Sequence, residues 1–134
     1  MLDTNVVLDA WVFKDPGMAS VLDALATGTV AWLASARMRD ELARTLGYRQ
    51  LERWKPDTAQ VLAQFDHWAE THDTPPPCPL DLRCSDPDDQ VFLDLALHWR
   101  ARWLLTHDRA LLRLARRART RGVLILRPNE WRPP

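Results

Sequence analysis

Short apolar segments alternate with longer amphipathic segments along nearly the whole chain, and this alternation restricts the possible folds more than any other feature. Short runs typical of buried strands occupy residues 1–3, 30–34, 102–106 and 123–126. Apolar residues at helical spacing predict helices between them, over residues 18–27, 36–46, 56–72, 90–99 and 108–119. Strand and helix in alternation predict an α/β fold, with a parallel sheet and helices on both of its faces.

Glycine and proline mark the ends of these predicted elements. Gly28, Gly47 and Gly122 each follow a predicted helix, where a residue that tolerates a left-handed backbone is favoured. Residues 4–13 are too short and too apolar to assign by periodicity, and we interpret them as a short helix or turn. Proline lacks a backbone N–H and has a fixed φ, so residues 73–79 (DTPPPCP) predict an extended surface loop.

The composition is that of one folded domain. With 134 residues, of which 46% are hydrophobic, residues 1–134 suit a single domain with its own core. We expect a cytoplasmic protein with no membrane partner, because no leader-like segment opens the chain and no uncharged stretch approaches the roughly 20 residues that a membrane span needs. Cys78 and Cys84 lack further metal-ligand partners at suitable spacing, so we interpret both as reduced thiols.

The net charge is zero, but the charges are unevenly distributed. Residues 1–98 contain 8 Lys/Arg against 16 Asp/Glu, whereas residues 99–134 contain 10 against 2. An acidic part followed by an arginine-rich part is compatible with a protein that uses a metal ion and binds nucleic acid. Solvent-exposed helix faces in an arginine-rich protein are the plainer alternative, and composition alone favours it.

Four acidic residues are predicted to gather at one edge of the sheet. Asp3 and Asp108 follow predicted strands, and the carboxyl ends of parallel strands meet at the edge where α/β proteins bind ligands. Asp89 shares a helix face with buried apolar residues, so its carboxylate should point toward the sheet. Glu41 lies on the flank of the apolar stripe of its helix, closer to that stripe than Asp40.

Carboxylates that meet without matching cations repel one another and raise each other's pKa. A hard divalent cation such as Mg²⁺ or Mn²⁺ removes this conflict because it prefers oxygen ligands. Two such ions about 4 Å apart can activate water against a phosphodiester without a nucleophilic side chain. For any one of the acids, an N-cap or an exposed turn remains an ordinary alternative.

These acids lie in sequence motifs that resemble PIN domains, and within that family the branch of VapC-like toxin components of toxin–antitoxin systems. The motifs occur in the expected order and spacing, and they are Asp3-Thr4-Asn5-Val6-Val7, Glu41-Leu42-Ala43-Arg44-Thr45-Leu46, Asp86-Pro87-Asp88-Asp89 with Phe92-Leu93 and Ala96, and Leu105-Thr106-His107-Asp108 with Leu111-Leu112. The resemblance covers essentially the whole chain. Each motif alone has low specificity, whereas the four together are specific.

The resemblance implies a Rossmann-like three-layer α/β/α sandwich and a ribonuclease that depends on Mg²⁺ or Mn²⁺. It implies catalytic, metal-binding roles for Asp3, Glu41, Asp89 and Asp108. Asn5 and Thr106 match small polar positions that orient such carboxylates, although a turn residue and a strand residue are the plainer readings. The implied partners are RNA, a cognate antitoxin protein and a second copy of the chain.

Two features depart from the family pattern. Members usually have a few more residues before the first aspartate, whereas only Met1 and Leu2 precede Asp3, so either the strand is short or the true start lies upstream. His107 occupies a position that is more often small or polar, and we expect it to point outward.

The predicted helix after Asp108 carries many arginines. Those on neighbouring helical positions could hold an RNA backbone near the metal site, and they are Arg109, Arg113, Arg116 and Arg117. A solvated face that complements the helix dipole explains them equally well.

Two other functions are alternatives to the ribonuclease. A haloacid-dehalogenase-like phosphatase needs a second aspartate two positions after the first, where this chain has Asn5. A PIN-like module that binds RNA or protein without catalysis is the alternative from another class, and the presence of all four acids argues against it.

Overall fold

The computed structural model describes residues 1–73, 76–78 and 80–134. Of the predicted loop at 73–79, residues 74, 75 and 79 lie outside the described part, and the remaining residues are in neither a helix nor a strand. The α-helices are α1 (Thr4–Trp11), α2 (Ala19–Ala26), α3 (Ala36–Leu46), α4 (Thr58–Trp68), α5 (Gln90–His98), α6 (Arg109–Leu112) and α7 (Ala115–Thr120). The strands are β1 (Trp32–Ser35), β2 (Ala69–His72), β3 (Trp103–Leu105) and β4 (Leu124–Leu126). Short 3₁₀ helices are η1 (Pro16–Met18), η2 (Arg49–Trp54), η3 (Leu80–Leu82) and η4 (Pro128–Glu130).

The strands pair in parallel, as the alternation of strand and helix predicts. β1 pairs with β2, and β3 pairs with β4, in two separate two-stranded sheets. The predicted first strand is reduced to a single parallel bridge between Leu2 and Leu105. Two backbone hydrogen bonds hold it there: the Leu105 N–H donates to the Met1 carbonyl (2.9 Å), and the Asp3 N–H donates to the Leu105 carbonyl (3.1 Å). The N-terminal segment therefore extends the β3–β4 sheet.

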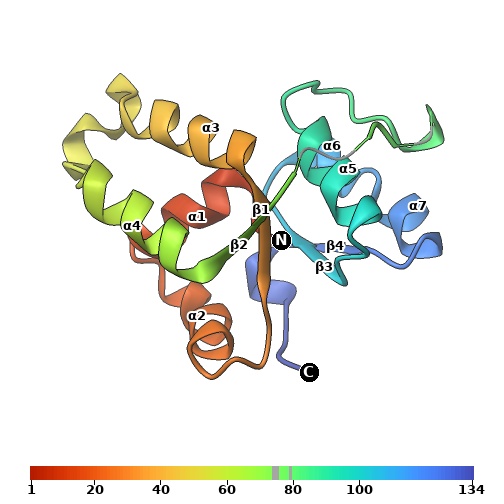
Figure 1. The fold of residues 1–134 in the computed structure, drawn as a ribbon, viewed down its shortest axis with the longest axis horizontal. Helices are drawn as coiled ribbons and strands as arrows, with labels where there is room; N and C mark the ends of the chain where they lie inside the picture. Colours follow the sequence, from red (N-terminus) through yellow and green to blue (C-terminus); the bar gives the residue numbers. More distant parts are fainter. Residues whose placement is uncertain (74–75, 79) are drawn as a thin grey trace.

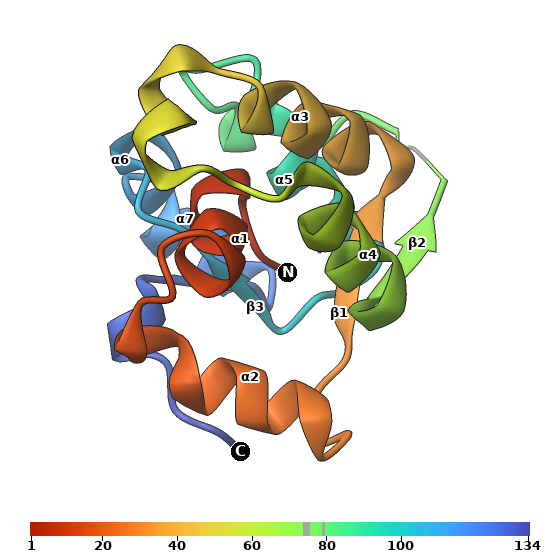
Figure 2. The same ribbon diagram turned by 90° about the vertical axis from the view of Figure 1, so that its left-hand side faces the viewer.

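The helices form layers on either side of the strands, which makes the fold the Rossmann-like α/β type that was expected. In Figure 1, α1 to α4 lie on one side of β1, and α5 to α7 lie on the other. Within the first layer, α1 and α4 lie between α3 at one end and α2 at the other (Figures 1 and 2). In the second layer, α5 packs against β3 and α7 against β4.

Residues 69–72 were predicted to end a helix, and this prediction was wrong. Helix α4 ends at Trp68, Ala69 adopts an extended backbone, and the chain continues as β2. The reason is non-local, because residues 69–72 pair one for one with Trp32–Ser35 of β1, and such pairing overrides local helix propensity. Within α4, Val61 and Phe65 are buried.

The helix predicted over residues 108–119 is divided into α6 and α7. The Leu114 N–H donates to the Leu111 carbonyl (3.0 Å), a tighter turn than that of an α-helix, and α7 starts at the next residue. Leu111 and Leu114 are both buried, so the break does not interrupt the apolar stripe.

Aromatic packing anchors β1 to the first helical layer. Trp32 of β1 is buried, stacks on Trp11 of α1 with ring centroids 5.5 Å apart, and meets Phe65 of α4 edge-on at 4.9 Å. Burial of a large apolar side chain stabilises a fold by about 1.5–3 kcal/mol, and aromatic pairing adds to this. These contacts fix α1, and with it Asp3, relative to the strands. Within the described ranges, no helix combines the length and apolar character that a membrane crossing requires.

Candidate metal centre

Asp3 is buried at the start of α1, where its two carboxylate oxygens have different partners. Oδ1 caps the helix by accepting a hydrogen bond from the Val6 N–H (2.9 Å), and Oδ2 accepts one from the Thr106 hydroxyl. Only 4% of Asp3 is exposed. Burial raises the pKa of Asp3 to about 6, although the bonds from Thr106 and Val6 and the nearby His107 act to lower it. The ionised form of this carboxylate is therefore costly in the absence of a cation.

Asp108 is held beside Asp3 by the same threonine. The Thr106 hydroxyl oxygen accepts a hydrogen bond from the Asp108 N–H (2.9 Å). The Asp108 side chain caps α6, because Oδ1 accepts from the N–H groups of Ala110 (2.7 Å) and Leu111 (3.4 Å). Thr106, which follows β3, thus fixes both Asp3 and Asp108. Both acids lie at the edge of the sheet where they were expected.

Asp89 faces Asp108 and carries an oxygen without a partner. It directly precedes α5, but its side chain makes no capping bond, and its buried Oδ2 has no hydrogen-bond partner within the described residues. Burial and then the neighbouring Asp108 carboxylate raise the pKa of Asp89 to about 8. A buried carboxylate oxygen with no donor is unfavourable unless another group binds it.

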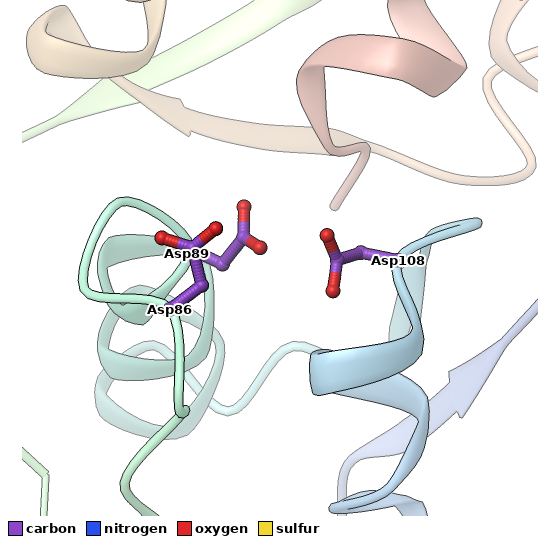
Figure 3. Close-up of side chains that lie close together, drawn as sticks. All are labelled: Asp86, Asp89 and Asp108. Carbon is purple, nitrogen blue, oxygen red and sulfur yellow. The ribbon is translucent and has the colours of Figure 1, made fainter.

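Asp86 completes a cluster that was not foreseen in this form. One carboxylate oxygen from each of Asp86, Asp89 and Asp108 lies within 4.8 Å of the other two. Figure 3 shows Asp86 and Asp89 on one side of a gap and Asp108 pointing toward them from α6. The sequence signal is the run Asp86-Pro87-Asp88-Asp89, whose residue types are typical of a turn that precedes a helix. Asp86 Oδ1 does accept from the Asp88 N–H (3.0 Å), so it has both roles.

Glu41 contributes from α3, on the opposite wall. Its Oε2 accepts a hydrogen bond from the Thr4 hydroxyl (2.8 Å). A cavity of about 340 Å³ is lined by all four predicted acids, and we call it the acid cavity: Asp3, Glu41, Asp89 and Asp108, together with Thr4, Asn5, Leu8, Phe13, Thr45, Tyr48, Gln50, Leu51 and Phe92. The structure thus brings the four predicted acids to one cavity.

A comparison with protein-family models decides the family. The model of the PIN domain matches residues 1–110. This chain belongs to the PIN domain family. PIN domains are generally metal-dependent nucleases, so the family indicates nuclease chemistry at a divalent-metal site. It also suggests an RNA substrate. Searches among curated proteins and among solved structures give no match.

The matched part of this PIN domain contains the whole acid cavity and ends within α6. Of the four arginines predicted to bind RNA, Arg113, Arg116 and Arg117 lie beyond it, and the Arg117 guanidinium donates to the Asp81 carbonyl (3.3 Å). All four are exposed, and none lines the acid cavity. They are also divided between α6, α7 and the link between them, so the continuous helix on which the prediction rested is absent.

The two other polar positions behave differently from expectation. Asn5 lines the acid cavity, but within the described ranges its side chain makes no hydrogen bond to an acid of the PIN site. Thr4, one residue earlier, makes such a bond instead. His107 is exposed, as expected, and its Nε2 lies 2.7 Å from Oδ2 of Asp9 in α1.

The residues of this PIN domain fit a hard divalent cation. The donors are carboxylate oxygens, which Mg²⁺ and Mn²⁺ prefer. The buried Asp89 Oδ2 lacks a protein donor, and no lysine or arginine in the described part of the chain forms a salt bridge with these acids. A bound cation would offset both deficits.

Proposed function

We propose that this PIN domain is an endoribonuclease that depends on Mg²⁺ or Mn²⁺ and hydrolyses phosphodiester bonds of RNA. The observation that carries the proposal is the cluster of Asp86, Asp89 and Asp108, with a buried Asp89 oxygen that has no donor in the described part of the chain. Exposed acidic groups often gather without function, but a buried unpaired carboxylate oxygen is rare in folded proteins.

In this proposal, Asp3, Glu41, Asp89 and Asp108 hold the metal, and Asp86 adds a carboxylate next to Asp89. When bound, the ion supplies the Lewis acidity that activates water and stabilises the leaving oxygen. The protein supplies rigid positions. Val6 and Thr106 fix Asp3, the start of α6 fixes Asp108, and Thr4 fixes Glu41. Prearranged ligands of this kind do not need to reorganise during the reaction.

Cleavage of a labelled RNA by purified protein tests the activity. We expect cleavage in Mg²⁺ or Mn²⁺, none in a chelator, and a large loss with Asp3→Asn and Asp89→Asn. Both changes keep the side-chain shape, and asparagine still caps α1 at position 3. Asp23→Asn on the exposed face of α2 is the matched control and should cleave normally. Normal cleavage by the site variants would overturn the proposal.

Metal titration separates the enzyme from a PIN domain that only binds. A cation that binds the folded state alone stabilises it, by about 3 kcal/mol at 100 times its Kd, so the melting temperature should rise with Mg²⁺ or Mn²⁺. No rise at millimolar metal, together with no cleavage, would identify an inert binding module.

We further propose that this enzyme is the cytoplasmic toxin of a toxin–antitoxin pair and forms a homodimer. The support is the resemblance of its motifs to VapC-like toxins, together with the family match. Expression in a bacterial host should stop growth, Asp89→Asn should abolish the effect, and a small DNA-binding protein encoded next to it should relieve it. Unimpaired growth during verified expression of active protein would contradict the toxin role. Light scattering of the purified protein measures the oligomeric state.

A further inference from the structure

One face of α3 carries two arginines on either side of Glu41, and an exposed tyrosine continues it. Arg37, Glu41 and Arg44 follow one another at intervals of four and three residues, which places them on the same helical face. Tyr48 comes four residues after Arg44, just past the end of α3, and 53% of it is exposed.

Arg37 and Arg44 differ from Arg39, which lies between them on α3. Arg39 is used within the fold, because its guanidinium donates two hydrogen bonds to Asp66 of α4 (2.7 and 2.9 Å). Arg37 and Arg44 are exposed and, within the described residues, have no hydrogen-bond or salt-bridge partner. Unpaired surface arginines are common, so their position relative to the acid cavity is the deciding point.

A chain of hollows connects these arginines to the acid cavity. A narrow hollow of about 100 Å³ shares Glu41 and Tyr48 with the acid cavity and is also lined by Arg37, Arg44 and Asp88. A wider hollow of about 550 Å³ shares Arg37 with the narrow one and continues between α3 and the start of α5. The three hollows therefore neighbour one another, each sharing lining side chains with the next.

We propose that single-stranded RNA runs along this path, with phosphates bound by Arg37 and Arg44 and one base stacked on Tyr48. This inference rests on the ribonuclease function proposed above and assigns the part of the substrate that lies beyond the cleaved bond. Guanidinium groups bind phosphate oxygens through paired donors, and an exposed aromatic ring stacks on any unpaired base. We call Arg37, Arg44 and Tyr48 the α3 track.

The acidic groups that face the path restrict how it works. Asp88 lines the narrow hollow, and Asp94 lines the wider one, where its Oδ1 accepts hydrogen bonds from the Cys78 N–H (2.8 Å) and Gln90 Nε2 (2.9 Å). Arg83 also lines the wider hollow, so Glu41, Asp88 and Asp94 balance the three arginines of the path in formal charge. The path is therefore not a basic patch that binds any polyanion. It places single guanidinium groups next to a cavity lined by carboxylates, where they can bind the phosphates of an RNA strand that the carboxylates would otherwise repel.

The dimensions favour a single strand over a duplex. A base paired within a duplex cannot place its face on Tyr48, and a hollow of about 100 Å³ is too small to admit a duplex. Duplex RNA of the same sequence should therefore compete poorly.

Fluorescence anisotropy with a labelled single-stranded RNA of about 12 nucleotides tests the track. The Asp89→Asn protein serves as background, so that the probe stays intact. Arg37→Glu with Arg44→Glu should weaken binding at least about tenfold and reduce the slope of log K against log salt concentration by about 1.4, the value for two lost phosphate contacts on a single strand. Tyr48→Ala should weaken it about 5- to 100-fold, whereas Tyr48→Phe should retain affinity.

Arg119→Glu is the matched control, because Arg119 is exposed on α7 and lines none of these hollows. Melting temperatures establish that every variant is folded. Equal effects of the α3 changes and Arg119→Glu would overturn the track. RNA binding that survives charge reversal, with a glutamate-rich peptide bound by the unchanged arginines instead, would also overturn it and identify a protein-docking surface.

Kinetics separate failure of the track from failure of the ribonuclease function. In the protein with all four acids intact, Arg37→Glu with Arg44→Glu should raise KM for the longer RNA and leave kcat nearly unchanged. This pair of changes should not affect cleavage of a dinucleotide, whose single phosphodiester is the one cleaved and which therefore has no further phosphate for these arginines to bind. If the unaltered protein cleaves RNA and the α3 changes have no effect on either substrate, the track is wrong and the ribonuclease function stands. If the unaltered protein binds RNA through the track without cleaving it, the track stands and the ribonuclease function is wrong.

Discussion

The Thr106 hydroxyl donates a hydrogen bond to Asp3, a residue 103 positions earlier in the chain, and accepts one from the Asp108 backbone N–H. One buried side chain thus connects the two strand ends that carry acids of the site. Thr106 itself is fully buried, so it positions the carboxylates rather than contacting a substrate.

Replacement of Thr106 by valine should therefore impair the site through Asp3. Valine has nearly the same shape but leaves the Asp3 oxygen without its donor, so we expect a loss of about 1–3 kcal/mol in stability of the metal-free protein. Metal affinity should fall about 10- to 100-fold. Chemical denaturation and calorimetric metal titration measure the two effects. Thr106→Ser keeps the hydroxyl, and if it is as impaired as Thr106→Val, the hydrogen bond is not the cause.

Asp89→Asn should have opposite effects on stability and on metal binding. The amide removes a charge that burial and Asp108 disfavour, so the metal-free fold should gain about 1–2 kcal/mol after allowance for solvent screening at this half-buried position. The stabilisation by Mg²⁺ or Mn²⁺ should disappear. Thermal unfolding in chelator and in metal checks both. A variant that is less stable than the unaltered protein in chelator would show that the Asp89 charge is already compensated.

Stability of the metal-free protein should fall as the pH rises from about 4 to 6. The pKa of Asp3 is raised from its ordinary 3.8 to about 6, so between these values the folded state binds more protons than the unfolded state. Under that condition the free energy of unfolding decreases with pH, and Asp3 alone accounts for about 3 kcal/mol. Above pH 6, Asp89, with a pKa of about 8, continues to lower stability, whereas the buried Met1 amino group, whose pKa burial lowers from 8.0 to about 5, acts in the opposite direction. Denaturation in chelator across this range measures the slope, which Asp3→Asn should flatten. Rising stability over the same range would refute the assignment.

Asp86 and Asp88 provide a matched pair within one turn. Asp86 lies in the three-carboxylate cluster and Asp88 does not, although both are exposed. We expect Asp86→Asn to weaken metal binding several-fold, because it removes a negative charge within 4.8 Å of Asp89 and Asp108. Asp88→Asn should change it little. Titration of both variants side by side is the measurement, and equal affinities would exclude Asp86 from the site.

The acids could be predicted from the sequence because their positions depend on local signals. Asp3 and Asp108 each follow a short apolar run, and the end of a parallel strand determines where such a residue lies. Asp89 and Glu41 follow from helical periodicity. Asp86 could not be placed in the same way, because its position depends on the conformation of a turn that contains Pro87.

Other features depend on contacts between distant segments, which a local pattern does not contain. Residues 69–72 continue a helical pattern and become a strand only because β1 is available to pair with them. The exchange of roles between Asn5 and Thr4 has a similar origin. Which of the two reaches Glu41 depends on how α1 is rotated against α3, and packing of the two helices sets that rotation. The α3 track could not be predicted either. Helical periodicity places Arg37 and Arg44 on one face, but the position of Tyr48 depends on the backbone conformation after Gly47, beyond the end of α3.

The double role of Asp3 has a practical consequence for spectroscopy. One of its oxygens accepts the Val6 amide hydrogen, while the carboxylate as a whole lines the acid cavity. Any event that draws electron density from this carboxylate, such as ion binding or protonation, alters the hydrogen bond that begins α1. The Val6 amide resonance and its rate of exchange with deuterium therefore report site occupancy from inside the fold, with no label in the cavity and no substrate present.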